Sequence, residues 1–360
     1  MTKILCTADN HLGYKQYGLQ VREQDIYDSF NNILKLAVKE KVDAITISGD
    51  LLHATRPSSR TITFLKECHD YLIFREMPAF VVAGNHDKSE PHWIDTLCAV
   101  SWDGQQGGFV LLENNHVEVK DMVIHGAPFT NKKAWQNDKE LMRPDTDILL
   151  MHQSFQEFIQ FETDDAFSQE DVEGLAKAVV VGDIHVTMKA AGSEIYSPGS
   201  SELMSATEEP QKYVLLVDNE NGNESPLNCH FVELPTRKVI EGNIIDEQDA
   251  EEFFKTLREN ADENPLVFVK CDFSLSGVIE RIRSLYENKM IIRAKYYNPT
   301  VQESVALDTN VSLEEVLSKF IKQDEATYEL AVKLLDSECD ARYEIDSYIE
   351  NALKTNSDDL

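Results

Sequence analysis

VVVGDIHV, residues 179–186, runs from three branched apolar side chains through Gly182 to Asp183 and His185. The apolar part is typical of a strand buried in a core, and the two polar side chains that follow are typical metal ligands. Residues i and i+2 of an extended or turning segment can point the same way, so both could reach one ion. A single pair of this kind is more often structural than functional, so its meaning depends on whether the pattern recurs.

The pattern recurs four times, because short apolar runs also end at Asp9 with His11, at Asp50, at Asn85 with His86, and at His152. Each run is rich in β-branched residues, which predicts a buried strand. Helical patterns with an apolar stripe lie between several runs, at 22–40 and 58–74. This alternation predicts an α/β (α+β) fold, in which ligands gather at the carboxyl ends of the strands.

The remaining chain predicts three further regions. Strand-like runs at 108–112, 116–120, 122–126, 194–200, 212–218 and 228–234 predict a second set of strands and thus a core between two sheets. Residues 234–243 are expected to form an exit segment, and 244–300 a small α+β unit with helices at 247–260 and 276–288. Residues 312–353 predict two acidic helices with apolar stripes. The expected division is a main domain at 1–235, a capping domain at 244–300 and a helical segment at 308–360.

Composition narrows the class of protein. The chain has 360 residues and is 42% hydrophobic, without a run of the roughly 18 apolar residues that span a bilayer. Its first residues lack the pattern of a secretory signal, so we expect no membrane association. Six cysteines are scattered without a CxxC pair, which argues against zinc ribbons and disulfide frameworks and favours a reducing cytoplasm.

The charge balance is strongly acidic. Lys and Arg total 34 against 64 Asp and Glu, a net charge of −30, and residues 301–360 hold 15 acidic and 5 basic residues. Proteins that bind nucleic acid alone usually carry a basic footprint. Two interpretations stay open for the acidic end: a solvated surface, or a tail that docks on a basic partner.

The polar residues at the strand ends form a possible metal site. They comprise three carboxylates, one amide and three imidazoles: Asp9, Asp50, Asp183, Asn85, His11, His152 and His185. Oxygen and nitrogen ligands without thiolates suit Mn²⁺, Fe²⁺, Mg²⁺ or Zn²⁺ in a catalytic role. Seven ligands fit two ions that share a carboxylate. Such a pair, roughly 3.5–4 Å apart, can activate water and stabilise the attacking and leaving oxygens of a phosphoester.

This ordered set of motifs resembles the calcineurin-like metallophosphoesterases, and within them the DNA repair nucleases called meiotic-recombination-eleven in eukaryotes and archaea and SbcD in bacteria. The resemblance covers about residues 1–235. It is sharpest in TADNHLGYKQYG (7–18), GDLLHATRPSSRT (49–61), GNHD (84–87), MHQSF (151–155) and SPGSSE (197–202). The stretch GDLLHxxxPS favours the nucleases over other phosphoesterases. The resemblance implies two β-sheets packed as a sandwich and flanked by helices.

The resemblance also implies roles for individual residues. One metal is expected to be held by Asp9, His11 and His185, the other by Asn85, His152 and Asp183, and Asp50 is expected to bridge the two. His86 is expected to steady the transition state or protonate the leaving oxygen. His53 is expected to position the phosphate for exonuclease action. The family usually has GHxH where this chain has GDIH at 182–185. A carboxylate at Asp183 lowers the positive charge of the loaded site, so we expect tighter metal binding and a weaker pull on phosphate.

Partners follow from the same resemblance. Family members work as dimers bound to an SMC-like coiled-coil ATPase, which could supply the positive field that this acidic chain lacks. The helices within 308–360 are expected to bind the ATPase. The alternative is that these two helices pack on the rest of their own chain. DNA could pass the basic residues Arg56, Arg60, Lys132, Lys133 and Arg143. Helices near 58–74 and 91–100 are dimer candidates, with Leu65, Trp93, Ile94 and Leu97 as apolar contacts.

The expected function is therefore a DNA nuclease with two divalent ions, Mn²⁺ ahead of Mg²⁺. It would combine double-strand 3′–5′ exonuclease and single-strand endonuclease action in repair, recombination or replication, in the cytoplasm at a nucleoid or in a phage-infected cell. Two alternatives stay open. One is another phosphoesterase acting on small or protein phosphates, and the other is a non-catalytic scaffold for the ATPase.

Overall fold

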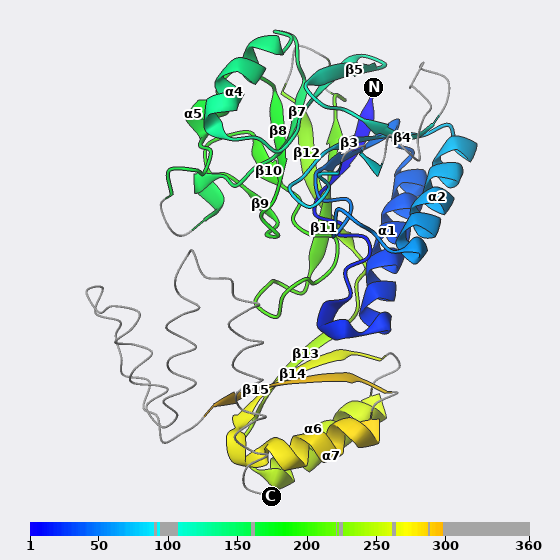
Figure 1. Ribbon diagram of the computed structural model, residues 1–360, viewed down its shortest axis with the longest axis vertical. Helices are drawn as coiled ribbons and strands as arrows, with labels where there is room; N and C mark the ends of the chain where they lie inside the picture. The colour runs from blue at the N-terminus through cyan, green and yellow to red at the C-terminus, as the bar shows by residue number, and fades with distance from the viewer. Residues whose placement is uncertain are drawn as a thin grey trace, which may run out of the picture. The chain divides into compact units, whose positions relative to one another are not determined.

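The computed structural model describes residues 1–89, 92–93, 107–159, 163–220, 222, 226–260, 264–286 and 289–297 (Figure 1). Residues Met1–Tyr297 form one compact unit. The predicted helices within 308–360 lie outside the described residues. Among the residues that the structure describes, no helix is both long enough and apolar enough to cross a membrane.

The first sheet has six strands in the order β12-β11-β1-β2-β3-β4. Its strands are β1 (Lys3–Thr7), β2 (Ala44–Ser48), β3 (Pro78–Val82), β4 (Gly108–Leu111), β11 (Lys212–Asp218) and β12 (Asn228–Leu234). The first four are parallel, whereas β11 runs antiparallel to both β1 and β12. The first strand of the chain, β1, thus lies beside β11, which comes about 200 residues later.

The second sheet has the order β5-β6-β7-β8-β10-β9. Its strands are β5 (Asn115–Val119), β6 (Met122–Ala127), β7 (Ile148–His152), β8 (Ala178–Gly182), β9 (Met188–Lys189) and β10 (Ile195–Ser197). The central pairs are parallel, and β5 and β9 pair antiparallel at the two edges.

The prediction of two packed sheets is confirmed, but the expected division of the strands between them is wrong. Strands β7 and β8 belong to the second sheet, while β4, β11 and β12 complete the first. An apolar run indicates that a strand is buried but does not encode its neighbour. Pairing is decided by packing between distant segments.

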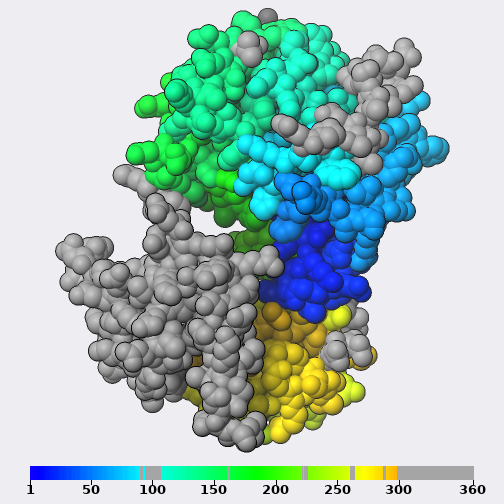
Figure 2. All heavy atoms as spheres, viewed as in Figure 1, coloured from blue at the N-terminus to red at the C-terminus, as the bar shows by residue number. Residues whose placement is uncertain are grey.

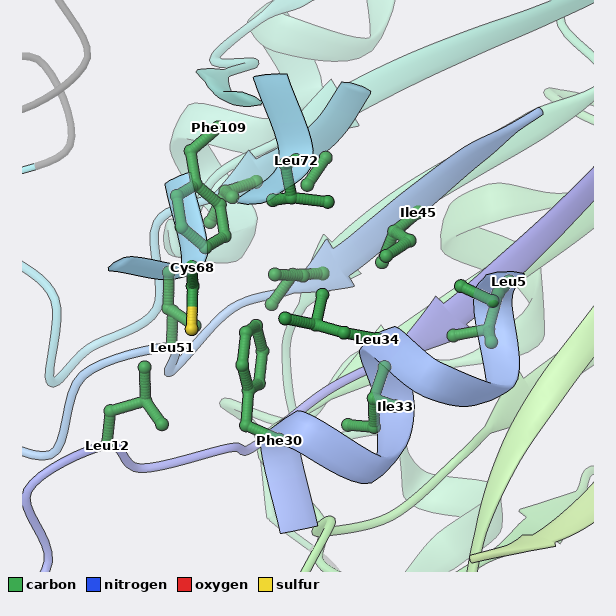
Figure 3. Close-up of a cluster of buried hydrophobic side chains, with 14 of the residues drawn as sticks. Leu5, Leu12, Phe30, Ile33, Leu34, Ile45, Leu51, Cys68, Leu72 and Phe109 are labelled. Atoms are coloured by element: carbon green, nitrogen blue, oxygen red, sulfur yellow. The ribbon is translucent and has the colours of Figure 1, made fainter. Parts of the chain in front are cut away.

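Helices cover the outer faces of both sheets. They are α1 (Gln20–Glu40), α2 (Ser59–Phe74), α4 (Lys132–Asp138) and α5 (Gln169–Val172), with short 3-10 turns η1 (Gln16–Gly18), η2 (Lys139–Leu141) and η3 (Gln156–Phe158). Figure 3 shows the cluster under α1 and α2, in which Phe30, Ile33, Leu34, Cys68 and Leu72 meet Leu5 and Ile45 of the first sheet. Alternate residues of β1 point the other way, so Ile4 and Cys6 join the core between the sheets. Each buried Leu, Ile or Phe contributes about 1.5–3 kcal/mol of apolar burial.

A three-stranded unit, residues 239–297, follows the two sheets. Its parallel sheet has the order β13-β14-β15. The elements are β13 (Val239–Ile244), α6 (Glu247–Asn260), β14 (Leu266–Asp272), η4 (Phe273–Leu275), α7 (Ser276–Tyr286) and β15 (Ile291–Tyr297). Both helices lie on one face of the sheet (Figure 1). The segment predicted as an exit (234–243) is therefore a strand from Val239 onward.

The opposite face of the three-stranded unit packs on the N-terminal part of the chain. Leu266 and Ile291 share an apolar cluster with Leu203, and Tyr17 lies beside them. The side chain of Arg237 pairs with both carboxylate oxygens of Asp25 at 2.6 Å. Figure 2 shows the yellow and orange atoms of this unit directly against the blue atoms of the N-terminal segment.

Candidate metal centre

The carboxyl ends of five parallel strands converge on one cleft. Strands β1, β2 and β3 of the first sheet and β7 and β8 of the second each deliver a polar loop there, and short bridges such as Ala8–Ser200 and Leu12–Leu52 hold the loops together. The cleft has a volume of about 300 Å³ and is lined by His11, Tyr14, Asp50, His53, Asn85, His86, Asp183, His185, Met204, Ser205 and Glu208. Two further predicted ligands, Asp9 and His152, are fully buried beside it.

The backbone of the ligand loops is held in an unusual conformation. Asp9, His11, Asp50 and Asp183 have φ values of 49°, 46°, 50° and 88°. This left-handed region costs side chains other than glycine on the order of 1–3 kcal/mol each and is concentrated at functional sites. Each strand is parallel and buried, so the chain must turn sharply at its end. The turn directs the next side chain into the cleft.

One group of predicted ligands contains Asp9, His11 and His185. Their donor atoms all lie within 4.8 Å of one another. His11 Nε2 and His185 Nε2 face each other at 3.1 Å. Oδ2 of Asp9 is buried and has no hydrogen-bond partner among the described residues. Two facing ring nitrogens and an unpaired carboxylate oxygen are a donor set that fits a divalent cation.

A second group surrounds His152. Its Nε2 lies 3.2 Å from Asn85 Oδ1, 3.4 Å from Asp50 Oδ1 and 3.9 Å from Asp183 Oδ1. Its Nδ1 lies 2.9 Å from the carbonyl oxygen of Ser48, which orients the ring with Nε2 toward the cleft. The other oxygen of Asp50, Oδ2, lies 3.7 Å from His11 Nε2. Asp50 thus reaches both groups, which is the position expected of a bridging carboxylate.

Burial and charge shift the titration of these groups. Burial raises the pKa of Asp9 to about 6 and lowers the pKa of His11 to about 3. Burial also lowers the pKa of His152, but its hydrogen bond to Asp50 and the charges of Asp9 and Asp50 outweigh this and raise that pKa to about 10. At neutral pH, His11 is therefore neutral and the carboxylate of Asp9 is ionised, whereas His152 carries a proton that a bound cation would have to displace.

Two glycines of the motifs are required by close approach. A Cβ atom on Gly84 would lie 2.0 Å from Asp50 Oδ1 and 2.5 Å from the Asp50 backbone nitrogen. A Cβ atom on Gly49 would lie 2.1 Å from His152 Nδ1, and its φ of +84° also disfavours a side chain. The GD and GNHD motifs therefore place backbone, not side chains, against the metal-binding groups.

The two residues with predicted catalytic roles also reach the cleft. His53 and His86 stack with their ring centroids 5.3 Å apart, and each lies within 5.4 Å of the His11 ring. The backbone N–H of His86 donates to Asp50 Oδ1 at 3.0 Å. Tyr14, which the sequence analysis did not single out, lies 4.4 Å from the His53 ring.

Two supporting carboxylates, Asp87 and Glu208, are not among the predicted site residues. Asp87 accepts hydrogen bonds from the backbone N–H groups of Leu51, Leu52 and Gly84, and so ties the loop after β2 to the loop after β3. Asp87 is the last residue of the GNHD motif, so the motif could have identified it as a residue of the site. Glu208 lies 2.9 Å from His185 Nδ1. It follows no buried strand, and nothing in its local sequence marks it.

The basic residues predicted to lie along a DNA path are not in the cleft. Arg60 pairs with Glu23, Lys132 with Asp171, and Arg143 with Glu118 and Asp145; neither these three nor Arg56 nor Lys133 line the cleft. Of the four apolar residues predicted to form a dimer contact, one lies in the core of its own chain. Leu65 is fully buried in the core and cannot present an apolar surface. The Trp93 indole donates to the Thr55 carbonyl at 2.8 Å, while Ile94 and Leu97 lie outside the described residues.

Comparison with known proteins gives a family and several relatives. The sequence profile of the calcineurin-like phosphoesterases matches residues 2–187. The DNA double-strand break repair protein Mre11 of Methanosarcina mazei is 29% identical over an alignment of 325 residues that covers 84% of this chain and 51% of the relative. The proteins of the same name from Archaeoglobus fulgidus (29% identity, 76% of this chain, 69% of the relative) and Methanococcus maripaludis (24%, 95% and 98%) are also similar. The chain spans about half the length of the Methanosarcina mazei relative.

Proposed function

Since the chain belongs to the calcineurin-like phosphoesterases, we propose that it is a DNA nuclease of the Mre11 and SbcD type that hydrolyses phosphodiesters with two divalent ions. The observation that carries the proposal is the convergence of seven oxygen and nitrogen ligands on one cleft, with Asp50 within reach of both groups. DNA is favoured as substrate because relatives named for double-strand break repair match as much as 95% of this chain.

Each ligand has a defined task in this proposal. Asp9, His11 and His185 would hold one ion, Asn85, His152 and Asp183 the other, and Asp50 both. The ions, Mn²⁺ ahead of Mg²⁺, would supply an activated water and neutralise charge on the phosphate. Burial also lowers the pKa of His53, so its neutral ring can donate one hydrogen bond to a phosphate oxygen. His86 lies beside it and can donate a proton to the leaving 3′ oxygen.

The charge of the chain bears on its partners. With a net charge of −30 and no lysine or arginine along the described cleft lining, the chain is poorly suited to attract DNA alone. We therefore propose that an SMC-like coiled-coil ATPase supplies the positive field and docks on residues 308–360. A homodimer through the surfaces near 58–74 and 91–100, acting on cytoplasmic DNA, completes the proposal.

One observation favours a second candidate function. A cleft of about 300 Å³ without a basic lining also suits a phosphoesterase that acts on small or protein phosphates. The two functions differ in substrate and not in the metal centre, so a panel of substrates separates them.

The decisive assay is cleavage of a 3′-labelled duplex and a single-stranded circle with Mn²⁺, Mg²⁺ or EDTA, beside an Asp50→Asn control. Mn²⁺-dependent cleavage that the control lacks would support the proposal and show whether DNA ends are needed. Hydrolysis of bis-p-nitrophenyl phosphate without DNA cleavage, and unchanged on adding the ATPase, would favour the second candidate. Failure to hydrolyse either substrate would leave a scaffold role for the fold.

The partner proposal has its own test. A chain that lacks residues 308–360 is expected to lose binding to the ATPase and to keep metal-dependent hydrolysis of the small diester. Binding that survives the deletion would contradict the docking proposal without touching the chemistry.

A further inference from the structure

Glu208 lies at the centre of a hydrogen-bonded cluster next to the metal centre. Its Oε2 accepts from Lys212 Nζ at 2.7 Å, from Ser200 Oγ at 3.0 Å and from the Met204 backbone N–H at 3.1 Å. Its Oε1 lies 2.9 Å from His185 Nδ1. One oxygen is thus fixed by three donors, which leaves the other aimed at a single imidazole.

The cluster is buried and held by several hydrogen bonds. The side chains of Glu208 and Lys212 are 9% and 2% exposed, and Lys212 also donates to Ser200 at 3.0 Å. Ser200 forms a β-bridge with Ala8, directly before Asp9. The carboxylate of Glu208 is therefore positioned relative to the same loop that delivers Asp9 and His11.

His185 needs such support more than its counterpart in the second group. The side chain of His185 is 28% exposed and lies beyond the end of β8, whereas His152 is fully buried and bonds to the Ser48 carbonyl through Nδ1. A carboxylate accepts hydrogen bonds, so Nδ1 of His185 carries a proton, and in the neutral ring Nε2 then holds the lone pair. Nε2 is the atom that faces His11 across the cleft.

We infer that Glu208 is a positioning residue for the first metal: it selects the Nδ1–H tautomer of His185 and holds the Nε2 lone pair at the ion bound by Asp9, His11 and His185. The Ser48 carbonyl has the same relation to His152 in the second group. Outer partners of this kind typically change metal affinity by roughly 10–100-fold when they are removed. The inference rests on the proposed two-metal site.

Metal binding tests the inference directly. Isothermal titration of the metal-free protein with Mn²⁺ is expected to show that Glu208→Ala weakens one of two sites by roughly 10–100-fold and leaves the other within about twofold. Glu208→Gln keeps a carbonyl oxygen for Nδ1–H and should restore most of the affinity. Glu202→Ala is the matched control, because Glu202 is also buried and paired with a buried cation, Arg22, but does not contact His185.

The wild-type protein provides a measurement that no folding defect can obscure. Long-range ¹H–¹⁵N spectra of histidine-labelled, metal-free protein, recorded at a pH at which the His185 ring is neutral, are expected to show His185 as the Nδ1–H tautomer, assigned by its loss in His185→Gln. An Nε2–H tautomer, or two Mn²⁺ sites of unchanged affinity in Glu208→Ala, would overturn the inference. A wild-type protein that binds no Mn²⁺ would instead count against the proposed function.

Discussion

Replacing Gly84 with alanine should disable the proposed metal centre while the fold survives. The added Cβ atom would lie 2.0 Å from Asp50 Oδ1, whereas ordinary contact begins at 3.4 Å, so the carboxylate must retreat by about 1.4 Å. The Asp50 backbone nitrogen, at 2.5 Å, blocks an escape of the methyl group to that side. Because Asp50 reaches both groups of ligands, its displacement alters both proposed sites at once.

The magnitude follows from this displacement. A misplacement of about 1 Å at a catalytic centre can lower the rate by about 100-fold, so Gly84→Ala should lower kcat/KM for bis-p-nitrophenyl phosphate by at least about that factor. Overpacking should lower the free energy of unfolding by only about 1–3 kcal/mol. The variant should therefore melt cooperatively below wild type, yet bind Mn²⁺ weakly in isothermal titration.

Two other glycines provide controls for this variant. A Cβ atom on Gly277 of α7 meets nothing within 4 Å, so Gly277→Ala should keep full activity. Gly174 has equally open space but a φ of +73°, so Gly174→Ala should lose stability through backbone strain and keep activity. Wild-type Mn²⁺ affinity and turnover in Gly84→Ala would refute the reasoning, because Asp50 could then move without consequence.

Three further predictions concern metal and pH. Mn²⁺ at 100 times its Kd should stabilise the folded protein by about 2.7 kcal/mol per site, and Asp50→Asn should remove most of this gain in thermal melts with Mn²⁺ or EDTA; equal shifts in both proteins would contradict the site. Asp183→His should weaken Mn²⁺ binding in isothermal titration, because the site loses one negative charge, and an unchanged affinity would dismiss the proposed effect of the carboxylate. Burial lowers the pKa of His125 on β6 from 6.5 to about 4, so its neutral form is the stable folded one. This group leaves the free energy of unfolding unchanged above pH 6.5 and lowers it as the pH falls from 6.5 toward 4, by at most about 1.4 kcal/mol per pH unit, and His125→Leu should flatten that part of the urea-unfolding profile; an unchanged pH dependence would exclude His125 as the cause.

Much of the site could be predicted because local patterns carried the information. Each of the five strands is a short apolar run, and a polar residue that directly follows a buried strand lies at the carboxyl end of the sheet, where ligands bind in α/β folds. Parallel pairing of β1 with β2 brings Asp9 and Asp50 together, and the packing of the second sheet on the first adds His152 at the end of β7, so that the three lie within 4.8 Å. Sequence alone therefore located the candidate ligands before any distance was known.

The parts that were missed depend on contacts between distant segments. Membership of the two sheets could not be deduced, because an apolar run reports burial and not the identity of its neighbour. Glu208 acquires its importance only when the loop before β11 folds back onto the loop after β8. Leu65 was expected at a dimer contact, but the apolar stripe of α2 faces its own sheet, since a stripe marks burial without stating what covers it.

The place of β1 in its sheet has a consequence for the order of events during synthesis. Its partners are β2, about 40 residues downstream, and β11, which begins at Lys212. At roughly 5–20 residues per second, the ribosome needs about 10–40 s to make the chain between β1 and β11. During that interval one edge of β1 lacks its partner strand β11. His185 and Glu208 have not yet been synthesised when Asp9 leaves the ribosome. The nascent chain thus cannot assemble the metal centre until more than half of it has been made, and contacts of such long sequence separation favour slow folding.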